Sequence, residues 1–277
     1  MTHSPSPDEA TAAAFATSWN HLPTGSVYTI EQFADWMDPL NASDVKNRTV
    51  LELGCGNGSL LVHMAQWDPS SLTGVDLGDS VLSARRNLSV VSSIRWRVEQ
   101  HDLVTYRADA MDLVYCIGVL HHLDEPQAGF KSVIENTRPG GRFHCWVYAH
   151  EGNTLVRWLV EPLRRIACRL PWWMTKYTLA TPLSIPVFGA AFLLQLLPES
   201  WCRRLPLGLY LRWLGRREWS FSRHVVFDQL VTPRTVYISK EEITCWLKEC
   251  PQIDPDSIYM IHRNGNSWKF GGLLREA

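Results

Sequence analysis

The sequence predicts an α/β fold in which a mostly parallel sheet is interrupted by a helical insertion. Three observations support this prediction. Apolar strand patterns alternate with helical patterns over residues 49–149, as in successive βαβ units. Residues 151–225 then read as short helices broken by Pro162, Pro171, Pro182, Pro186 and Pro198. Two strand patterns near the C-terminus are joined by Asn264 and Gly265, a pair typical of a tight hairpin turn.

The first element is VLELGCGNGSLL, residues 50–61, which reads as a buried strand, a glycine-rich turn and the start of a helix. Gly54, Gly56 and Gly58 permit backbone angles and close approach that a side chain would block. A dinucleotide fingerprint, G-x-G-x-x-G, would place glycine where this chain has Ser59. The turn therefore predicts a cofactor site of another kind.

Glu52, two residues before the first glycine, completes a pattern that resembles the first motif of class I S-adenosylmethionine (SAM) dependent methyltransferases, (V/I)-L-(E/D)-x-G-x-G-x-G. In that family the glycine turn contacts the methionine part of SAM and the acid orients it. The resemblance implies these roles for Glu52, Gly54, Gly56 and Gly58, with SAM as the cofactor. It also implies a Rossmann-like seven-stranded sheet, mostly parallel with the last strand antiparallel.

The next two strands end in residues that suit a nucleoside. A strand ending at Asp76 is followed by Leu77 and a helix. Because an ionised carboxylate accepts hydrogen bonds through two oxygens, Asp76 could hold both ribose hydroxyls, as the resemblance implies. The third strand ends before Asp102 and Leu103, which the resemblance places at the adenine amino group and ring face. A solvated loop aspartate is the alternative for Asp102.

MDLVYCIGVLHHL, residues 111–123, resembles the fourth strand of the family and its exit. The resemblance implies that Cys116 and Ile117 pass beside the methionine part of SAM and that His121 and His122 stand near the donor methyl. A histidine at this place is the general base in some sugar O-methyltransferases, so both are candidate catalytic residues, with a core role as the alternative. Since adjacent strand residues point to opposite faces, we predict no metal site. Pro139, Gly140 and Gly141 are expected to form a turn before a fifth strand.

Residues 1–48 precede the core of residues 49–150 and are expected to form a helical lid. In related enzymes an N-terminal helix folds over SAM and substrate, and a sulfonium favours an aromatic face. Tyr28 is therefore a candidate cofactor contact and Trp19 a candidate substrate contact, with plain packing on the sheet as the alternative. Residues 226–277 are expected to complete the core fold.

The insertion is basic and rich in tryptophan. Residues 151–225 hold 11 of the 27 basic residues against four acids, a formal +7 where the remainder carries −8, and six of the 13 tryptophans. We expect a helical cap between the fifth and sixth strands that accepts a hydrophobic or aromatic small molecule. Weak substrate-site candidates at its edges are Tyr148, His150, His224, Asp228 and Tyr237.

The arginines of the cap leave three alternatives: an acidic substrate, anionic lipid headgroups with the tryptophans in the interface, or simple solvation. The apolar run of residues 183–197 is expected to be too short to cross a bilayer, which needs about 20 residues. Membrane contact would therefore be peripheral. The arginines concerned are Arg164, Arg165, Arg203, Arg204, Arg216 and Arg217.

Length and composition indicate the domain organisation and the cellular compartment. A chain of 277 residues with 45% apolar content suits one domain with a sizeable insertion. The N-terminus lacks the pattern of a secretory signal, and none of the seven cysteines forms a C-x-x-C pair, so a reducing cytoplasm is expected, with neither disulfides nor a metal.

These observations together predict methyl transfer from SAM to O or N of a small, hydrophobic or aromatic acceptor, of the kind found in secondary metabolism. The alternatives are an RNA or protein methyltransferase that uses the basic cap, and a SAM-binding partner without activity. A DNA partner is not expected, and RNA is disfavoured because the chain lacks an N-P-P-(Y/F) motif. The oligomeric state stays open.

Overall fold

In the computed structural model, residues 6–20 and 28–276 are described, residues 18–20 by their backbone alone. The chain divides into two compact units. The first comprises Met1–Val147, Glu241–Ile261 and Lys269–Ala277, and the second comprises Tyr148–Lys240 and His262–Trp268. The second unit thus contains the insertion of 151–225 and extends beyond both of its ends.

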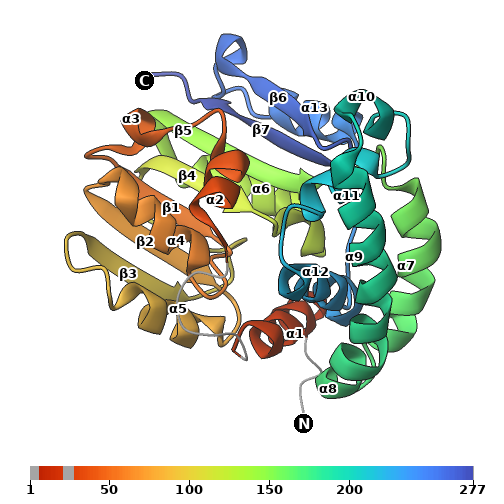
Figure 1. Cartoon of the computed structure of the whole chain (residues 1–277). Helices are drawn as coiled ribbons and strands as arrows, with labels where there is room; N and C mark the ends of the chain where they lie inside the picture. Colours follow the sequence, from red (N-terminus) through yellow and green to blue (C-terminus); the bar gives the residue numbers. More distant parts are fainter. Residues whose placement is uncertain (1–5, 21–27, 277) are drawn as a thin grey trace. The chain divides into compact units, whose positions relative to one another are not determined.

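A seven-stranded sheet in the order β3-β2-β1-β4-β5-β7-β6 organises the fold (Figure 1). β1 to β5 pair in parallel, and β7 enters antiparallel between β5 and β6, with Ala149 N donating to Asn266 O and Leu274 N to Gly141 O. This confirms the predicted sheet. The strands are β1 Thr49–Leu53, β2 Ser71–Asp76, β3 Arg95–Gln100, β4 Met111–Ile117, β5 Thr137–Tyr148, β6 Tyr259–Arg263 and β7 Ser267–Leu273.

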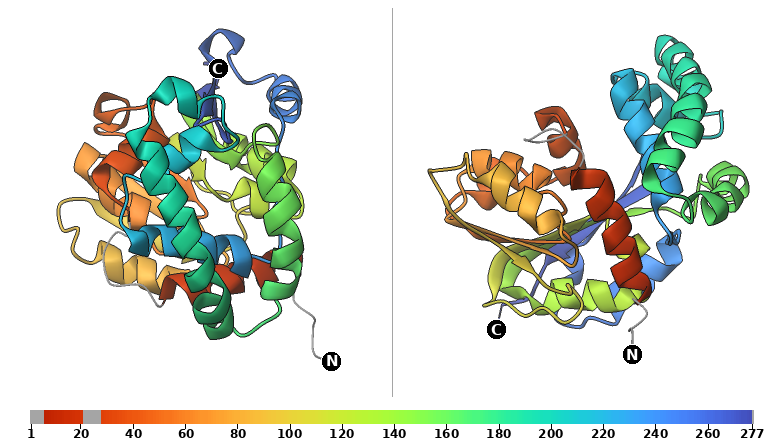
Figure 2. Two further views of the ribbon diagram at one scale, coloured as in Figure 1. Left: turned by 45° about the vertical axis from the view of Figure 1, so that its right-hand side comes forward. Right: turned by 90° about the horizontal axis from the view of Figure 1, so that it is seen from below.

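Helices cover both faces of the sheet (Figure 2). β1 and β4 are buried along nearly their whole length, as expected of parallel strands covered on two sides. α4 (Ser59–Met64) and α5 (Ser80–Leu88) lie on one face, and α6 (Pro126–Glu135) and α13 (Lys240–Lys248) on the other. On the latter face the Phe130 ring stacks on Trp246 at 5.9 Å between centroids, which joins α6 to α13.

Two turns were predicted at glycine residues. The structure contains one of them and lacks the other. Asn264 and Gly265 have φ of 50° and 70° and close the β6–β7 hairpin, as predicted. The turn predicted at residues 139–141 is wrong, because β5 continues through it. Gly140, with φ 70°, instead allows a bulge where the pairing with β4 shifts register, and the strand resumes beyond it.

Three helices precede β1: α1 (Pro7–Asn20), α2 (Ile30–Met37) and α3 (Ala42–Val45). α2 begins with a capping box between Thr29 and Gln32 and buries Phe33 and Met37 against the first unit. Tyr28, just before this helix, is fixed through its carbonyl oxygen, which lies 2.7 Å from His63 Nε2.

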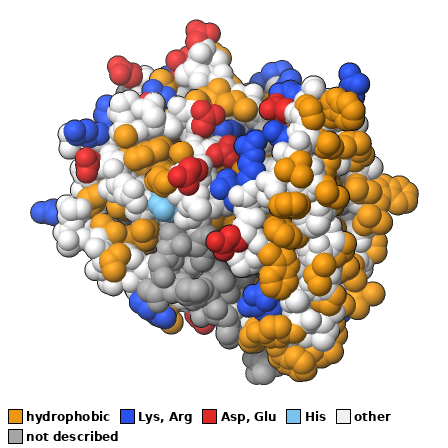
Figure 3. All heavy atoms as spheres, viewed as in Figure 1, with side chains coloured by type: hydrophobic (Ala, Val, Ile, Leu, Met, Phe, Trp, Pro, Cys, Tyr) orange, Lys and Arg blue, Asp and Glu red, His pale blue; other side chains and the backbone are white. Residues whose placement is uncertain are grey.

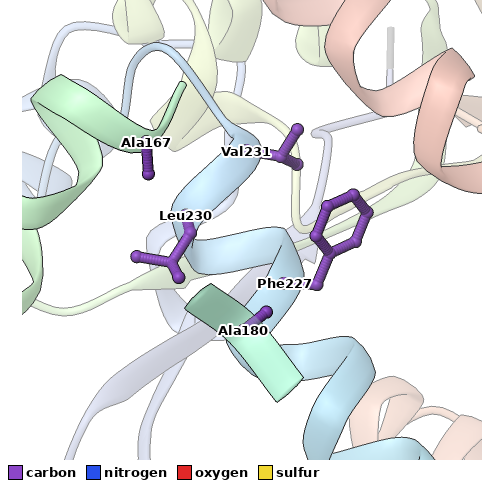
Figure 4. Close-up of a cluster of buried hydrophobic side chains, with 5 residues drawn as sticks. All are labelled: Ala167, Ala180, Phe227, Leu230 and Val231. Carbon is purple, nitrogen blue, oxygen red and sulfur yellow. The ribbon is translucent and has the colours of Figure 1, made fainter. Parts of the chain in front are cut away.

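The second unit is helical: α7 (Thr154–Ala167), α8 (Trp172–Met174), η3 (Thr175–Ala180), α9 (Thr181–Leu196), α10 (Glu199–Cys202), α11 (Gly208–Leu214) and α12 (Trp219–Val231). Its core gathers small and apolar side chains from α7, η3 and α12 (Figure 4). Pro171 and Pro198 precede helices, as predicted. The core residues are Ala167, Ala180, Phe227, Leu230 and Val231.

Three of the predicted helix breaks are wrong, because Pro162 lies inside α7 and both Pro182 and Pro186 lie inside the helix that α9 continues. All three prolines are exposed, so the backbone hydrogen bond that each removes is lost on the outer side of its helix. α8, η3 and α9 therefore run on as one helix, Trp172–Leu196, which by length and composition alone could cross a membrane. The prediction that this apolar stretch is too short to do so is wrong.

Candidate active site

The glycine turn after β1 requires glycine for steric reasons. Gly54, Gly56 and Gly58 have φ of 82°, 50° and 74°, in the left-handed region. A Cβ at Gly54 would stand 2.4 Å from Cγ2 of Val119, and one at Gly58 would stand 3.1 Å from Cβ of Ala84. The turn thus packs directly on the exit of β4, the place predicted for the donor methyl.

Asp76 ties this turn to the end of β2. Its Oδ2 accepts a hydrogen bond from Gly56 N at 2.9 Å, and its Oδ1 accepts from Gly78 N and Ser80 Oγ, each at 2.9 Å. Burial raises the pKa of Asp76, and these hydrogen bonds oppose the rise. Oδ2 carries one donor and keeps acceptor capacity for a ribose hydroxyl, so the carboxylate suits the role predicted for it.

Glu52 lies beneath the turn and is only 1% exposed. Tyr115 Oη donates to its Oε2 at 3.0 Å. Burial raises the pKa of Glu52 to about 8, and the nearby charge of Asp76 adds to the rise. A cation held beside Glu52 would lower this pKa again, which suits the cationic methionine part of SAM.

This pKa shift gives a prediction for stability. Because the folded protein holds the Glu52 proton up to about pH 8, while the unfolded chain releases it near the ordinary value of 4.5, Glu52 lowers the free energy of unfolding as pH rises between these values. Glu52→Gln keeps the shape and cannot ionise. We expect wild type to lose stability relative to this variant from pH 5 to 8, by on the order of a few kcal/mol. Urea unfolding of both proteins across this range measures it, and parallel pH profiles would refute it.

The residues predicted for the adenine lie at neighbouring strand ends. Asp76 pairs with Gln100 in the β2–β3 ladder, and Gln100 Nε2 donates to the carbonyl oxygen of Leu77 at 3.1 Å. Asp102 Oδ1 accepts from Val104 N at 2.9 Å, which shapes the loop after β3, and Leu103 is buried. The sheet therefore brings the ribose and adenine candidates to one edge.

A row of aromatic rings lies on the other side of the glycine turn, where β4 and β5 end. Each ring contacts the next, so that the row joins α1, α2, β5 and the exit of β4. Successive centroid distances are 4.6 Å for Tyr28–Trp36, 6.3 Å for Trp36–Trp146, 5.9 Å for Trp146–His121, 4.2 Å for His121–His122 and 4.9 Å for His122–Phe15. We call these six residues the aromatic row.

His121 and His122 are both buried within this row. They lie in a 3-10 turn, Leu120–His122, directly after β4, so their rings face one another instead of pointing to opposite sides as a strand would place them. The reason given above against joint metal binding is therefore wrong. Among residues 6–20 and 28–276 there is, however, no cluster of three or more His, Cys, Asp and Glu side chains that could hold a metal ion.

Sequence reasoning missed Phe15, Trp36 and Trp146. Trp146 could have been predicted from the sequence. It lies two residues before the candidate Tyr148 on β5, and side chains two residues apart on a strand point to the same face. Of the other candidates, Ile117 is largely buried and Cys116 completely so, which leaves the Cys116 backbone alone to reach a ligand. The remaining candidate of the lid, Trp19, has its side chain outside the described part.

α1 reaches both halves of this edge. Ala12 O lies 2.9 Å from the position that a Cβ on Gly78 would take, after β2, and Asp8 Oδ1 accepts from Asp124 N at 2.7 Å, after β4. α1 therefore lies across the carboxyl edge of the sheet between the exits of these two strands, and its action as a lid stays a prediction.

The five weak substrate candidates lie in the second unit. Tyr148 and Tyr237 stack at 6.3 Å, and Gln229 Nε2 donates to Tyr148 Oη at 2.9 Å. His224 Nε2 lies 3.1 Å from Asp228 Oδ2, and His150 Nε2 lies 2.5 Å from Arg157 Nη1. Burial raises the pKa of Tyr148 and of Tyr237. Four of the five candidates thus form two contacting pairs and His150 contacts Arg157, and their role in binding an acceptor stays a prediction.

Comparison with known proteins decides the family. A family model described as a methyltransferase domain matches residues 27–182, more than half of the chain. The chain belongs to this methyltransferase family. The matched span holds the glycine turn, Asp76 and both histidines, and the family is that of the class I SAM-dependent enzymes, as predicted.

Individual relatives of this chain are more distant. It is 31% identical over 117 residues to a ubiquinone biosynthesis O-methyltransferase of Bordetella avium, which covers 41% of this chain and 46% of the relative. An uncharacterized protein of Synechococcus is 29% identical over 119 residues, covering 41% of this chain and 28% of that protein. The match therefore spans less than half the length of these curated relatives.

Solved structures support the fold along nearly the whole chain. Magnesium protoporphyrin IX methyltransferase of Synechocystis with bound SAM has a TM-score of 0.53 at 12% identity, covering 99% of this chain and 100% of that one. An O-methyltransferase family protein of Burkholderia thailandensis has a TM-score of 0.51 at 13% identity, covering 90% and 55%. These structures support the fold alone, whereas the family itself has SAM as its cofactor. The residues at the carboxyl edge of β1 to β4 fit this cofactor.

Proposed function

We propose that this methyltransferase transfers the methyl group of SAM to a hydroxyl or amino group of a small, apolar or aromatic acceptor. The observation that carries the proposal is the aromatic row, which includes His121, two residues after the Val119 side chain that packs on the glycine turn. Aromatic rings favour flat, apolar partners through stacking and area burial. The relatives named for O-methylation in ubiquinone biosynthesis support oxygen as the atom methylated.

SAM supplies an electrophilic methyl on a sulfonium, so the protein needs chiefly to hold, align and dehydrate the reactants. Asp76 and Glu52 would hold the nucleoside and methionine parts of the cofactor. Trp146 and Trp36 would pack against the acceptor and exclude water. His121 or His122 would accept the proton from an acceptor hydroxyl, and their ring contacts within the row would fix the orientation of both side chains.

The base assignment is tested by His121→Asn and His122→Asn, each with a phenolic acceptor. We expect one of the two to lower kcat about 100-fold or more at neutral pH, as loss of a general base does. The defect should shrink as pH approaches the pKa of the acceptor hydroxyl, because that group then ionises by itself. Equal loss at every pH would assign the histidine a packing role, and full activity of both variants would remove the assignment.

The acceptor class is tested with radiolabelled SAM and a panel of phenols, apolar alcohols, aromatic amines and transfer RNA. Another relative, 29% identical over 105 residues, is named as a transfer RNA carboxymethyltransferase, which makes RNA the necessary competitor. We expect labelled product from phenols or other apolar acceptors. Labelled RNA without labelled small molecule would contradict the proposal, as would SAM binding without any product.

A further inference from the structure

The second unit carries apolar side chains on its surface in an ordered pattern. On α7 they are separated by three, four or seven residues, which places them on one side of the helix, and the same separations hold on α9. We call these eight residues the apolar face: Leu155, Trp158, Leu159 and Ile166 on α7, and Ile185, Phe192, Leu193 and Leu196 on α9. Figure 3 shows hydrophobic side chains gathered over these helices.

These side chains are not part of the core of the unit. Trp158 is 78% exposed, Leu193 65% and Ile185 62%. The opposite side of α7 provides the packing, through Ala167 in the core and through Arg164, which is 1% exposed and bonded to Glu161 and Gln229. Large contiguous apolar surface is rare on monomeric proteins and marks an interaction site.

The charge around the apolar face indicates its partner. Exposed arginines lie at the end of α7, after α10 and after α11, and the insertion carries a formal +7 although Arg203 pairs with Glu199. Tryptophans lie at the ends of the long apolar helix, Trp173 near its start and Trp201 just after its end, both exposed. Trp and Arg beside an apolar surface suit the headgroup level of a bilayer that contains anionic lipid. The exposed arginines are Arg165, Arg169, Arg203, Arg204 and Arg216.

We propose that the apolar face docks the methyltransferase on the surface of an anionic lipid bilayer, with the side chains of α7 and α9 in the interface and these arginines at the headgroups. Arg164, a lipid candidate in the sequence, has no part in this, because it is buried. The proposal goes beyond the proposed function and does not depend on which acceptor is methylated.

The long helix lies on the membrane and does not cross it. α9 packs along α11 and α12, and Arg212 of α11 donates to the carbonyl oxygens of Leu194, Gln195 and Leu197 at its end. A crossing orientation would draw Arg212 and the polar residues of α12 into the hydrocarbon, at a cost of several kcal/mol per charge. Docking by one face keeps these groups in water.

Flotation with phosphatidylcholine vesicles, with and without one quarter phosphatidylglycerol, tests the proposal on the intact chain. We expect the protein to float with the anionic vesicles and to be released by high salt. Trp158→Glu combined with Leu193→Glu should lower partitioning at least tenfold. Arg203→Glu combined with Arg204→Glu should lower it on anionic vesicles about fivefold per residue. Val90→Glu, at an apolar residue 75% exposed in the first unit, is the matched control and should leave flotation unchanged.

Three results would overturn the proposal. They are an absence of flotation with either vesicle, equal flotation with neutral and anionic vesicles, and equal loss in the Val90→Glu control. A second copy of the chain is the competing occupant of the apolar face, so mass is measured by light scattering without lipid. A dimer that Trp158→Glu and Leu193→Glu convert to a monomer would assign the face to self-association instead. Because flotation needs no turnover, its outcome is separable from that of the acceptor assay.

Discussion

Replacing Asp76 with asparagine is expected to weaken SAM binding about 100-fold, the loss of two charge-assisted hydrogen bonds. The asparagine side chain has one acceptor oxygen in place of two and turns an amide NH2 toward donors. The N–H groups of Gly56 and Gly78 both donate to the Asp76 carboxylate, each to a different oxygen. In the variant only one of these two N–H groups would keep an acceptor oxygen. The binding defect and a looser glycine turn therefore arise from the same change.

Equilibrium dialysis with labelled SAM measures the affinity of Asp76→Asn, and circular dichroism checks that the variant folds. The matched control is Asp79→Asn, three residues further on, where the carboxylate is exposed and accepts from Gln100 Nε2. We expect the control to bind SAM as wild type does. Equal affinities for the two variants would show that Asp76 does not hold the cofactor.

Gly54→Ala is expected to have the second large effect. Its φ of 82° costs an alanine about 1–2 kcal/mol, and the added Cβ would stand 2.4 Å from Val119, an overpacking worth about 1–3 kcal/mol more. To relieve this close contact, either the glycine turn or the exit of β4, which carries His121, must shift. We therefore expect a loss of stability of about 3 kcal/mol together with a large loss of SAM affinity.

Gly265→Ala separates the cost of backbone strain from the cost of overpacking. Gly265 also has a positive φ, of 70°, but no described atom lies within 4 Å of its would-be Cβ. Its substitution should cost only the backbone strain of about 1 kcal/mol and leave SAM affinity unchanged. Urea unfolding and dialysis of both variants measure the difference. A Gly54→Ala protein as stable as Gly265→Ala, with full SAM affinity, would contradict the packing described here.

Much of the first unit could be predicted from the sequence, because its signals are local. The strand and turn of residues 49–58, the carboxylate of Asp76 and the hairpin at Asn264 and Gly265 each depend on a few neighbouring residues. Parallel strands bring their carboxyl ends to one edge whatever lies between them, so the order of the motifs sufficed to place the cofactor candidates together.

The aromatic row could not be predicted in the same way. Phe15, Trp36 and Trp146 come from α1, α2 and β5, far apart in the chain, and only tertiary packing joins them to His121. The prolines likewise did not predict the helix ends. Pro162 and Pro186 lie on the exposed sides of their helices, where the loss of one backbone hydrogen bond is tolerated. The burial of Arg164 depended on Glu161 and on Gln229, 65 residues away.

The central claim is that the carboxyl edge of β1, β2 and β3 holds SAM. A crystal structure of the chain with S-adenosylhomocysteine, which binds without turnover, tests it most directly. We expect the ribose hydroxyls at the Asp76 carboxylate, the methionine part at the glycine turn above Glu52, and the sulfur facing the aromatic row. A nucleoside bound elsewhere, or none at saturating ligand, would contradict the claim.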